Sequence, residues 1–218
     1  MSANLKIRAL KRESYAEALA MSICESTESK FESNFKLIPV GNWVLTDSAT
    51  ISLIGNWRNR FNRFFLNQVN ANYENASGYL AAKADPTTDS IIFLIKDPTD
   101  QTVGHIGLSN IDGESAELDN VLLGRSPGIE NFMDSVENCL IEWANFHLGI
   151  SYIHLRVLSF NLLAIQLHER CGFQMKESIP LRLDEDNGYP VLEKAKPETA
   201  NVEYTCIFME RTFTERMS

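Results

Sequence analysis

Two carboxylates stand two positions apart in residues 115–124 (SAELDNVLLG), where they could do acid–base chemistry. Apolar and polar residues alternate here as in a strand, so Glu117 and Asp119 fall on one face, roughly 6 to 7 Å apart. By the same alternation, Val121 and Leu123 share that face. A half-buried carboxylate can take a proton from an amine or a water, so either of the two could act as a general base. The alternative is a solvated pair on the open face of an edge strand.

A second candidate is the turn at residues 124–128 (GRSPG), which precedes a segment with helical periodicity. The first turn of a helix presents backbone N–H groups that have no partner within the helix, and such groups bind phosphate oxygens well. Arg125 could add a charge-assisted contact. The alternative is an ordinary strand-to-helix turn, because many such turns contain Gly and Pro.

The third candidate is residues 161–173 (NLLAIQLHERCGF). Asn161 and His168 are seven positions apart with Ala164 between them, so one stripe of a helix carries an amide, a small residue and a titratable ring. These three side chains could line one edge of a ligand. The Gly-Phe pair that follows is expected to end the helix and to begin the next core strand. The alternative is a packed helix whose histidine faces outward.

An α+β fold must position these residues, with helices on both faces of a mixed sheet. Apolar residues that recur every three or four positions predict helices over residues 47–65, 129–149 and 161–172. Alternating or continuous apolar runs predict strands over residues 91–95, 102–111, 115–124, 151–160 and 202–213. The first three of these strands are expected to form an antiparallel meander, and residues 184–201 a loop or a long hairpin tip. Residues 1–39 are expected to be an extension of one domain, residues 40–218.

The amino-acid composition argues against some classes of binding partner. The chain carries 29 acidic and 20 basic side chains, a net charge of −9, and has no long basic block, which disfavours nucleic acid. No signal peptide and no run of about 20 apolar residues is present, so a cytoplasmic protein with no membrane partner is expected. The four cysteines lie far apart without a C-x-x-C pair. Neither a metal site nor a disulfide framework is therefore indicated, and reduced thiols are expected.

The order of these features resembles the GNAT acyl-CoA N-acetyltransferases over about residues 40–213. The family pattern Asn-x-x-Ala-x-x-x-Tyr-x-x-x-Gly-Phe is matched by residues 161–173, with His168 in place of the tyrosine. In the Arg/Gln-x-x-Gly-x-Gly/Ala turn, Arg125 and Gly128 match, while Glu130 stands where the family has Gly or Ala. Residues 57–65 (WRNRFNRFF) are similar to the branch that includes ribosomal-protein N-terminal acetyltransferases and amino-sugar acyltransferases.

The resemblance implies a sheet that is mostly antiparallel and splays to admit acetyl-CoA. The cofactor would be held by Val121, Leu122, Leu123, Arg125, Gly128, Ile129 and Asn161. A backbone N–H near Leu122 would polarise the thioester carbonyl. Asp119 would collect the proton of the amine, and His168 would protonate the departing thiolate. The acceptor would contact Trp57, Arg58 and Glu117, together with the polar span at residues 184–201.

The expected function is transfer of acetyl from acetyl-CoA to a primary amine of a small or nucleotide-linked metabolite, such as an amino sugar, without a metal. One alternative is acetylation of a protein N-terminus. An alternative of another class is a catalytically weak domain that binds acyl-CoA or serves as an interaction module. A homodimer is a possible assembly.

Overall fold

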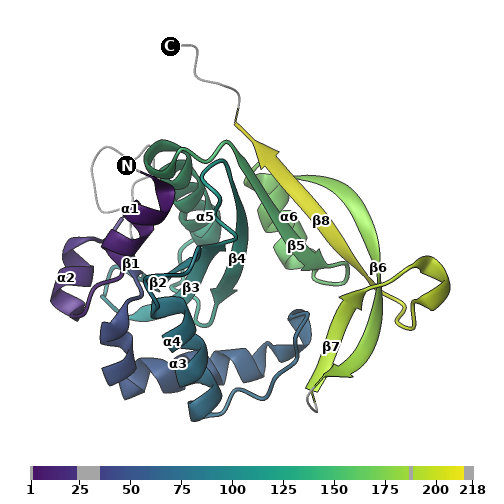
Figure 1. Cartoon of the computed structure of the whole chain (residues 1–218), viewed down its shortest axis with the longest axis horizontal. Coiled ribbons are helices and arrows are strands. Elements are labelled where there is room, and N and C mark those ends of the chain that lie inside the picture. Colours follow the sequence, from purple (N-terminus) through teal and green to yellow (C-terminus); the bar gives the residue numbers. More distant parts are fainter. Residues whose placement is uncertain (1, 24–34, 187–188, 214–218) are drawn as a thin grey trace.

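A computed structural model describes residues 2–23, 35–186 and 189–213 (Figure 1). These residues form an eight-stranded sheet in the order β1-β2-β3-β4-β5-β8-β6-β7. The strands are β1 (Lys36–Pro39), β2 (Ile91–Lys96), β3 (Thr102–Ser109), β4 (Ser115–Leu123), β5 (Tyr152–Leu158), β6 (Gln174–Asp186), β7 (Tyr189–Lys194) and β8 (Thr205–Thr212). All neighbouring strands are antiparallel except β4 and β5, which are parallel. The predicted mixed, mostly antiparallel sheet is confirmed.

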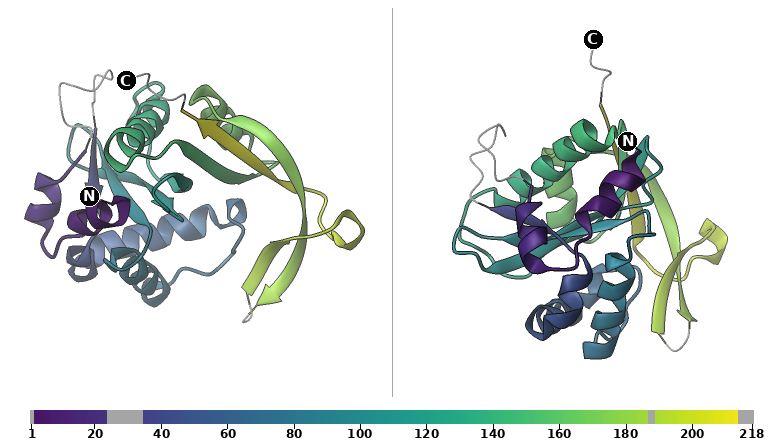
Figure 2. Two further views of the ribbon diagram at one scale, coloured as in Figure 1. Left: turned by 45° about the horizontal axis from the view of Figure 1, so that its top comes forward. Right: turned by 60° about the vertical axis from the view of Figure 1, so that its left-hand side comes forward.

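Helices cover both faces of this sheet (Figure 2). They are α1 (Ala3–Leu10), α2 (Tyr15–Ala20), α3 (Ser48–Arg60), α4 (Tyr73–Ala84), α5 (Phe132–Trp143) and α6 (Leu162–Arg170). Short helical turns follow at Asn42–Thr46, Asn62–Phe64, Ala144–Leu148 and Pro197–Thr199. Apolar residues of α1, α5 and α6 pack in one core with β2 to β5, whereas α2, α3 and α4 pack in a second core on the opposite face. The predicted α+β layering is confirmed.

The sheet divides between β4 and β5. These strands are in register at three residue pairs only, Ser115–Tyr152, Ala116–Ile153 and Glu117–His154. Beyond that point β4 continues to Leu123 and β5 to Leu158, and the two strands diverge (Figure 1). The expected splay is therefore present, and it separates the meander from the C-terminal strands.

A β-bulge changes the phase of β4 at Asn120. His105 pairs with Leu122 and Gly107 with Asp119, so two residues of β4 oppose one of β3. Asn120 has a left-handed φ of 57°, which asparagine tolerates better than most residues. Val121 and Leu123 consequently pack against the core on the α5 side. The prediction that they share a face with the two carboxylates is wrong, because the bulge reverses the alternation.

Several boundaries differ from those expected. The long helix begins at Phe132 and not at residue 129, because Asn131 has a φ of 50° and interrupts the turn before it. The first predicted helix ends at Arg60, before Phe61 and Phe65. Helix α4 was not predicted, because it buries little besides Ala76, Leu80 and Ala84.

Part of the expected N-terminal extension belongs to the core. Ile7 and Leu10 of α1 pack in the same core as α5, and β1 pairs with β2 at the edge of the sheet. A domain boundary near residue 40 stays a proposal.

The cysteines differ in state. Cys171 and Cys206 are free and buried. Cys139, in α5, is disulfide-bonded, so the expectation of reduced thiols is wrong there. Spacing along the chain does not reveal which cysteines a fold brings together.

Within the described ranges, no helix is long and apolar enough to cross a membrane.

Candidate active site

A cavity of about 680 Å³ lies where β4 and β5 separate. Residues 117–121 of β4 and 155–158 of β5 form its two sides. One end, here called the α6 end, is lined by Asn161, Ala164 and His168. The other, the α4 end, is lined by residues of α3 and α4 and of the segment 64–71 that connects them. Because the cavity passes through the sheet, a ligand at one end can meet a ligand at the other.

The α6 end is built by a well-capped helix. The Asn161 side chain caps α6, its Oδ1 accepting from the Ala164 N–H at 3.4 Å. At the other terminus Gly172 adopts a φ of 85°, and the N–H of Phe173 donates to the His168 carbonyl at 3.0 Å. Phe173 is buried in the core, as the Gly-Phe prediction expected. The motif thus fixes Asn161 and His168 on the cavity wall.

His168 has a partner that the sequence did not reveal. Its Nδ1 lies 2.9 and 3.0 Å from the two carboxylate oxygens of Glu137 in α5. The side chain of Glu137 is 0% exposed and that of His168 is 6% exposed. When ionised, a carboxylate only accepts hydrogen bonds, and Nδ1 of the ring is then the donor in this pair.

The bulge brings three polar groups together in the middle of the cavity. Nδ1 of His105 lies 2.7 Å from the backbone oxygen of Asn120, and a neutral ring donates there. Burial lowers the pKa of His105 to about 4, so this ring is uncharged near neutrality. The Tyr79 hydroxyl donates to Oδ1 of Asn120. Burial, and then the negative charge of Asp119, raise the pKa of Tyr79, which keeps the phenol protonated.

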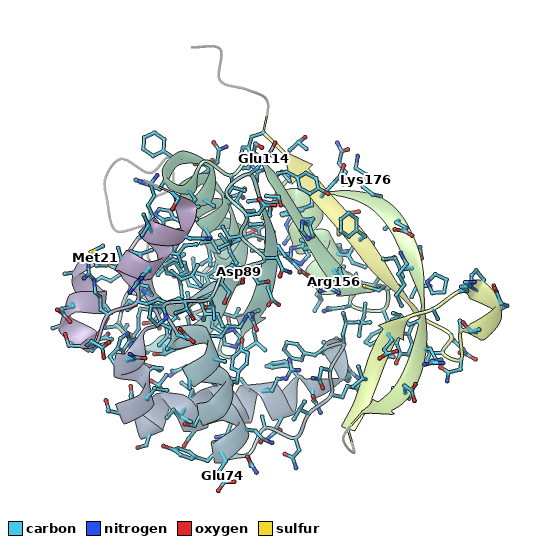
Figure 3. The ribbon with its side chains drawn as sticks, viewed as in Figure 1. Met21, Glu74, Asp89, Glu114, Arg156 and Lys176 are labelled. Carbon is cyan, nitrogen blue, oxygen red and sulfur yellow. The ribbon has the colours of Figure 1, made fainter. Side chains whose placement is uncertain are left out.

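The two carboxylates of β4 have different surroundings. Glu117 is buried and paired: Nε of Arg156 donates to it at 2.8 Å, and the Asn110 amide donates at 2.8 Å. Asp119 is 43% exposed and lies 3.8 Å from the Lys83 ammonium. The exposed Asp119 is therefore freer to exchange protons with solvent or a ligand, while Glu117 mainly holds Arg156 in place. Arg156 lies on β5 and lines the cavity (Figure 3).

Arg58 supplies positive charge at the α4 end. Its guanidinium lies 3.5 Å from the centre of the Phe65 ring and donates to the backbone oxygen of Asn67. Burial lowers its pKa to about 10, so it remains charged near neutrality. Among the described residues, no carboxylate lies within ion-pair distance of Arg58. A partly desolvated guanidinium with unused donors suits an anionic ligand group.

The remaining predicted residues lie outside the cavity lining. Trp57 is buried, and its indole packs so closely on Gly124 that a Cβ there would come within 2.0 Å of the ring. Leu122 is buried in the core with α3 and α4, and Leu123 packs against the opposite core. The acceptor site expected at residues 184–201 touches the cavity indirectly, because the Leu192 N–H donates to the Leu66 oxygen at 2.8 Å.

The turn at residues 124–128, which follows β4, is exposed to solvent at Arg125 and Gly128. Arg125 is exposed and donates to the Gln101 side chain, and Gly128 has a φ of 75° with no atom near the position of a Cβ. Ile129 is half-buried against the α5 core. The first N–H groups of α5 follow this turn, a geometry that suits phosphate oxygens. In the described part of the chain, no group of three or more His, Cys, Asp or Glu side chains is placed to hold a metal ion.

Comparisons with known proteins agree with this architecture. The model of the acetyltransferase (GNAT) domain matches residues 5–174. No curated protein sequence matches the chain.

Solved structures share the fold. Spermidine N-acetyltransferase from Vibrio cholerae, in complex with CoA and spermine, is 16% identical with a TM-score of 0.62, covering 83% of this chain and 96% of that one. The microcin C7 self-immunity acetyltransferase MccE, in complex with acetyl-CoA and AMP, is 15% identical with a TM-score of 0.62, covering 84% and 94%. The Campylobacter jejuni N-acetyltransferase PseH is 17% identical with a TM-score of 0.54, covering 84% and 100%.

Proposed function

Because the chain belongs to the acetyltransferase (GNAT) domain family, we propose that it transfers the acetyl group of acetyl-CoA to a primary amine of a small or nucleotide-linked metabolite. One observation carries the proposal: a single cavity passes through the split between β4 and β5, with His168 at one end and Asp119 and Arg58 toward the other. Such a site suits direct transfer between two bound molecules, because the donor and the acceptor must be held close together and correctly oriented.

Acetyl-CoA, as the acyl-donor substrate, fits the α6 end. The Asn161 amide and the small Ala164 line the path of its pantetheine arm. The open turn with Arg125 and Gly128, followed by the start of α5, suits its pyrophosphate. The bulge leaves Asn120 and Val121 without a register partner on β3, next to the paired Leu122, which suits a backbone N–H donor for the thioester oxygen.

The acceptor amine fits the α4 end. A neutral amine nitrogen attacks the thioester carbon, the C–N bond forms and the C–S bond breaks. Asp119, through water or directly, takes the proton that the nitrogen loses, because it is the more exposed of the two carboxylates on β4. Tyr79 stays protonated and holds Asn120 in the bulge through its hydrogen bond.

Arg58 favours an acceptor that carries an anionic group. Its guanidinium has no carboxylate partner among the described residues and retains donors that face the cavity. A phosphate of a nucleotide-linked amino sugar would satisfy these donors. MccE is described with AMP and the Vibrio cholerae enzyme with spermine, so both anionic and cationic partners occur among structures of this fold.

The enclosure of the α4 end favours a small acceptor over a protein N-terminus. The segment after α3 reaches β7, where the Leu192 N–H meets the Leu66 oxygen at 2.8 Å and Asn67 pairs with Val191. The Phe64 and Phe160 rings meet with centroids 5.9 Å apart. This closure leaves less room for an extended peptide than an open groove would.

Thiol release from acetyl-CoA tests the proposal. It would be followed with amino-sugar nucleotides, spermidine and peptides with free N-termini as acceptors, alongside calorimetric titration with acetyl-CoA alone. We expect heat on titration and the fastest release with a phosphate-bearing amine. Binding without release for any amine would favour the acyl-CoA-binding module, and fastest release with peptides would favour the N-terminal acetyltransferase.

A further inference from the structure

A fully buried glutamate stands on the apolar face of α5. Glu137 lies four residues after Met133 and three before Leu140, and both of these pack in the core. Its side chain is 0% exposed. An ionised carboxylate in such surroundings is costly unless it is paired and hydrogen-bonded.

The partner of Glu137 is a residue of the cavity wall. Both of its oxygens lie within 3.0 Å of Nδ1 of His168. The edge of the His168 ring also packs against Phe173, with centroids 5.9 Å apart, which fixes its orientation. With Nδ1 committed to Glu137, Nε2 is the ring nitrogen that can serve a ligand in the cavity, and the described residues offer it no hydrogen-bond partner.

Other charged or titratable groups nearby are occupied. Nε of Arg170 donates to Asp134 at 2.5 Å on the exposed side of the two helices. Arg211 of β8 donates to the Cys171 carbonyl at 2.5 Å. Burial, and then the negative charge of the nearby Glu137, raise the pKa of the Cys171 thiol, which is therefore neutral. Among the described groups, His168 is the one cation-forming side chain within ion-pair distance of Glu137.

A purely structural pair is a weak explanation for this arrangement. Replacing a buried ion pair by apolar residues is often neutral or stabilising, so burial of the pair does not itself account for it. Here one member of the pair also lines the cavity, so the carboxylate can act on a ligand through the ring.

We propose that Glu137 is a positioning residue of the acetyl transfer, holding His168 so that Nε2 faces the sulfur of the acyl donor. This inference rests on the proposed function. When the C–S bond breaks, its electron pair goes to sulfur, and Nε2 of the doubly protonated ring gives sulfur its proton. His168 is left neutral with its remaining proton on Nδ1, toward Glu137, and solvent restores the second proton after the thiol leaves.

The test is Glu137→Gln, which keeps size and polarity but removes the charge. We expect kcat to fall about 10- to 100-fold while the KM for acetyl-CoA changes less than about 2-fold, because the lost interaction serves the transition state. Glu142→Gln makes the same change at an exposed site of α5 and should match the wild type.

A double variant separates positioning from folding. If the pair acts as one unit, Glu137→Gln combined with His168→Gln should be no slower than His168→Gln alone. Histidine ring NMR should show the proton on Nδ1 of neutral His168 in the wild type.

Three results would overturn the inference: an unchanged kcat in Glu137→Gln, multiplicative losses in the double variant, or a wild-type proton on Nε2. In each case a wild type that turns over normally leaves the proposed function intact. A wild type that releases no thiol from any amine overturns both.

Discussion

His105 and His168 line the same cavity, and both are about 5% exposed, yet they have different partners. Nδ1 of His105 meets a neutral backbone carbonyl, that of Asn120, at 2.7 Å. Nδ1 of His168 meets a carboxylate, that of Glu137, at 2.9 Å. Burial without a counter-charge holds His105 neutral and makes it a support for the bulge, whereas the carboxylate beside His168 can stabilise a charged ring. The partner atom, more than the residue type, sets what each histidine can do.

The largest effect that separates them concerns stability in acid. The pKa of His105 is about 4 in the folded chain, below its ordinary 6.5, so the unfolded chain takes up a proton first as the pH falls. The neutral ring contributes fully to the free energy of unfolding above pH 6.5. This contribution, about 3 kcal/mol, is lost as the pH falls toward 4. Urea unfolding at neutral pH and at pH 4 should show His105→Gln losing less stability than the wild type. Equal losses would remove the contrast between the two rings.

The next effect is on turnover. His168→Ala should lower kcat about 100-fold, or about 2.7 kcal/mol of barrier, with a smaller change in the KM for acetyl-CoA. The reason is that the proton donor to sulfur is removed while the contacts that hold the donor molecule remain. Steady-state kinetics of thiol release measure both constants. Unchanged kinetics would show that His168, like His105, supports the structure of the cavity and takes no part in the transfer.

A smaller effect is expected at Asp119. Asp119→Asn should lower kcat/KM about 10-fold and remove the limb of the pH–rate profile that reports the proton acceptor. Glu114→Asn, at an exposed position just before β4, is the control. A profile that keeps both limbs would transfer the role to Glu117 or to water.

The smallest effect should be confined to the acceptor. Arg58→Gln should raise the KM for a phosphate-bearing amine about 10-fold and leave the KM for acetyl-CoA unchanged, because a charge-assisted hydrogen bond is lost at one end of the cavity only. Arg60→Gln changes an exposed arginine of the same helix and should have no effect. Equal changes in both KM values would show that the two ends are not separate sites.

What the sequence predicted well is local. The 161–173 motif predicted a helix, its left-handed ending at Gly172 and a core position for Phe173, because capping and periodicity act within a few residues. The antiparallel meander and the long helix α5 that follows it were predicted from apolar periodicity in the same way.

What it missed depends on contacts across the chain. Glu137 and His168 are 31 positions apart, and Tyr79 and Asn120 are 41 apart, so only the folded chain brings them together. One signal was available: Glu137 is an acid within the apolar stripe of a helix. The bulge at Asn120 leaves no mark in the hydrophobic pattern, and for that reason the phase of β4 was predicted wrongly.

The two ends of the cavity are lined by residues from two separate stretches of the chain. Residues between 54 and 79 line the α4 end and residues between 161 and 168 line the α6 end, with β4 and β5 between them. In evolutionary terms, one stretch can accumulate substitutions while the other is retained. If the acyl donor and the amine occupy separate ends, as proposed, a lineage with this fold can change the amine that it accepts while its acyl-donor site stays the same.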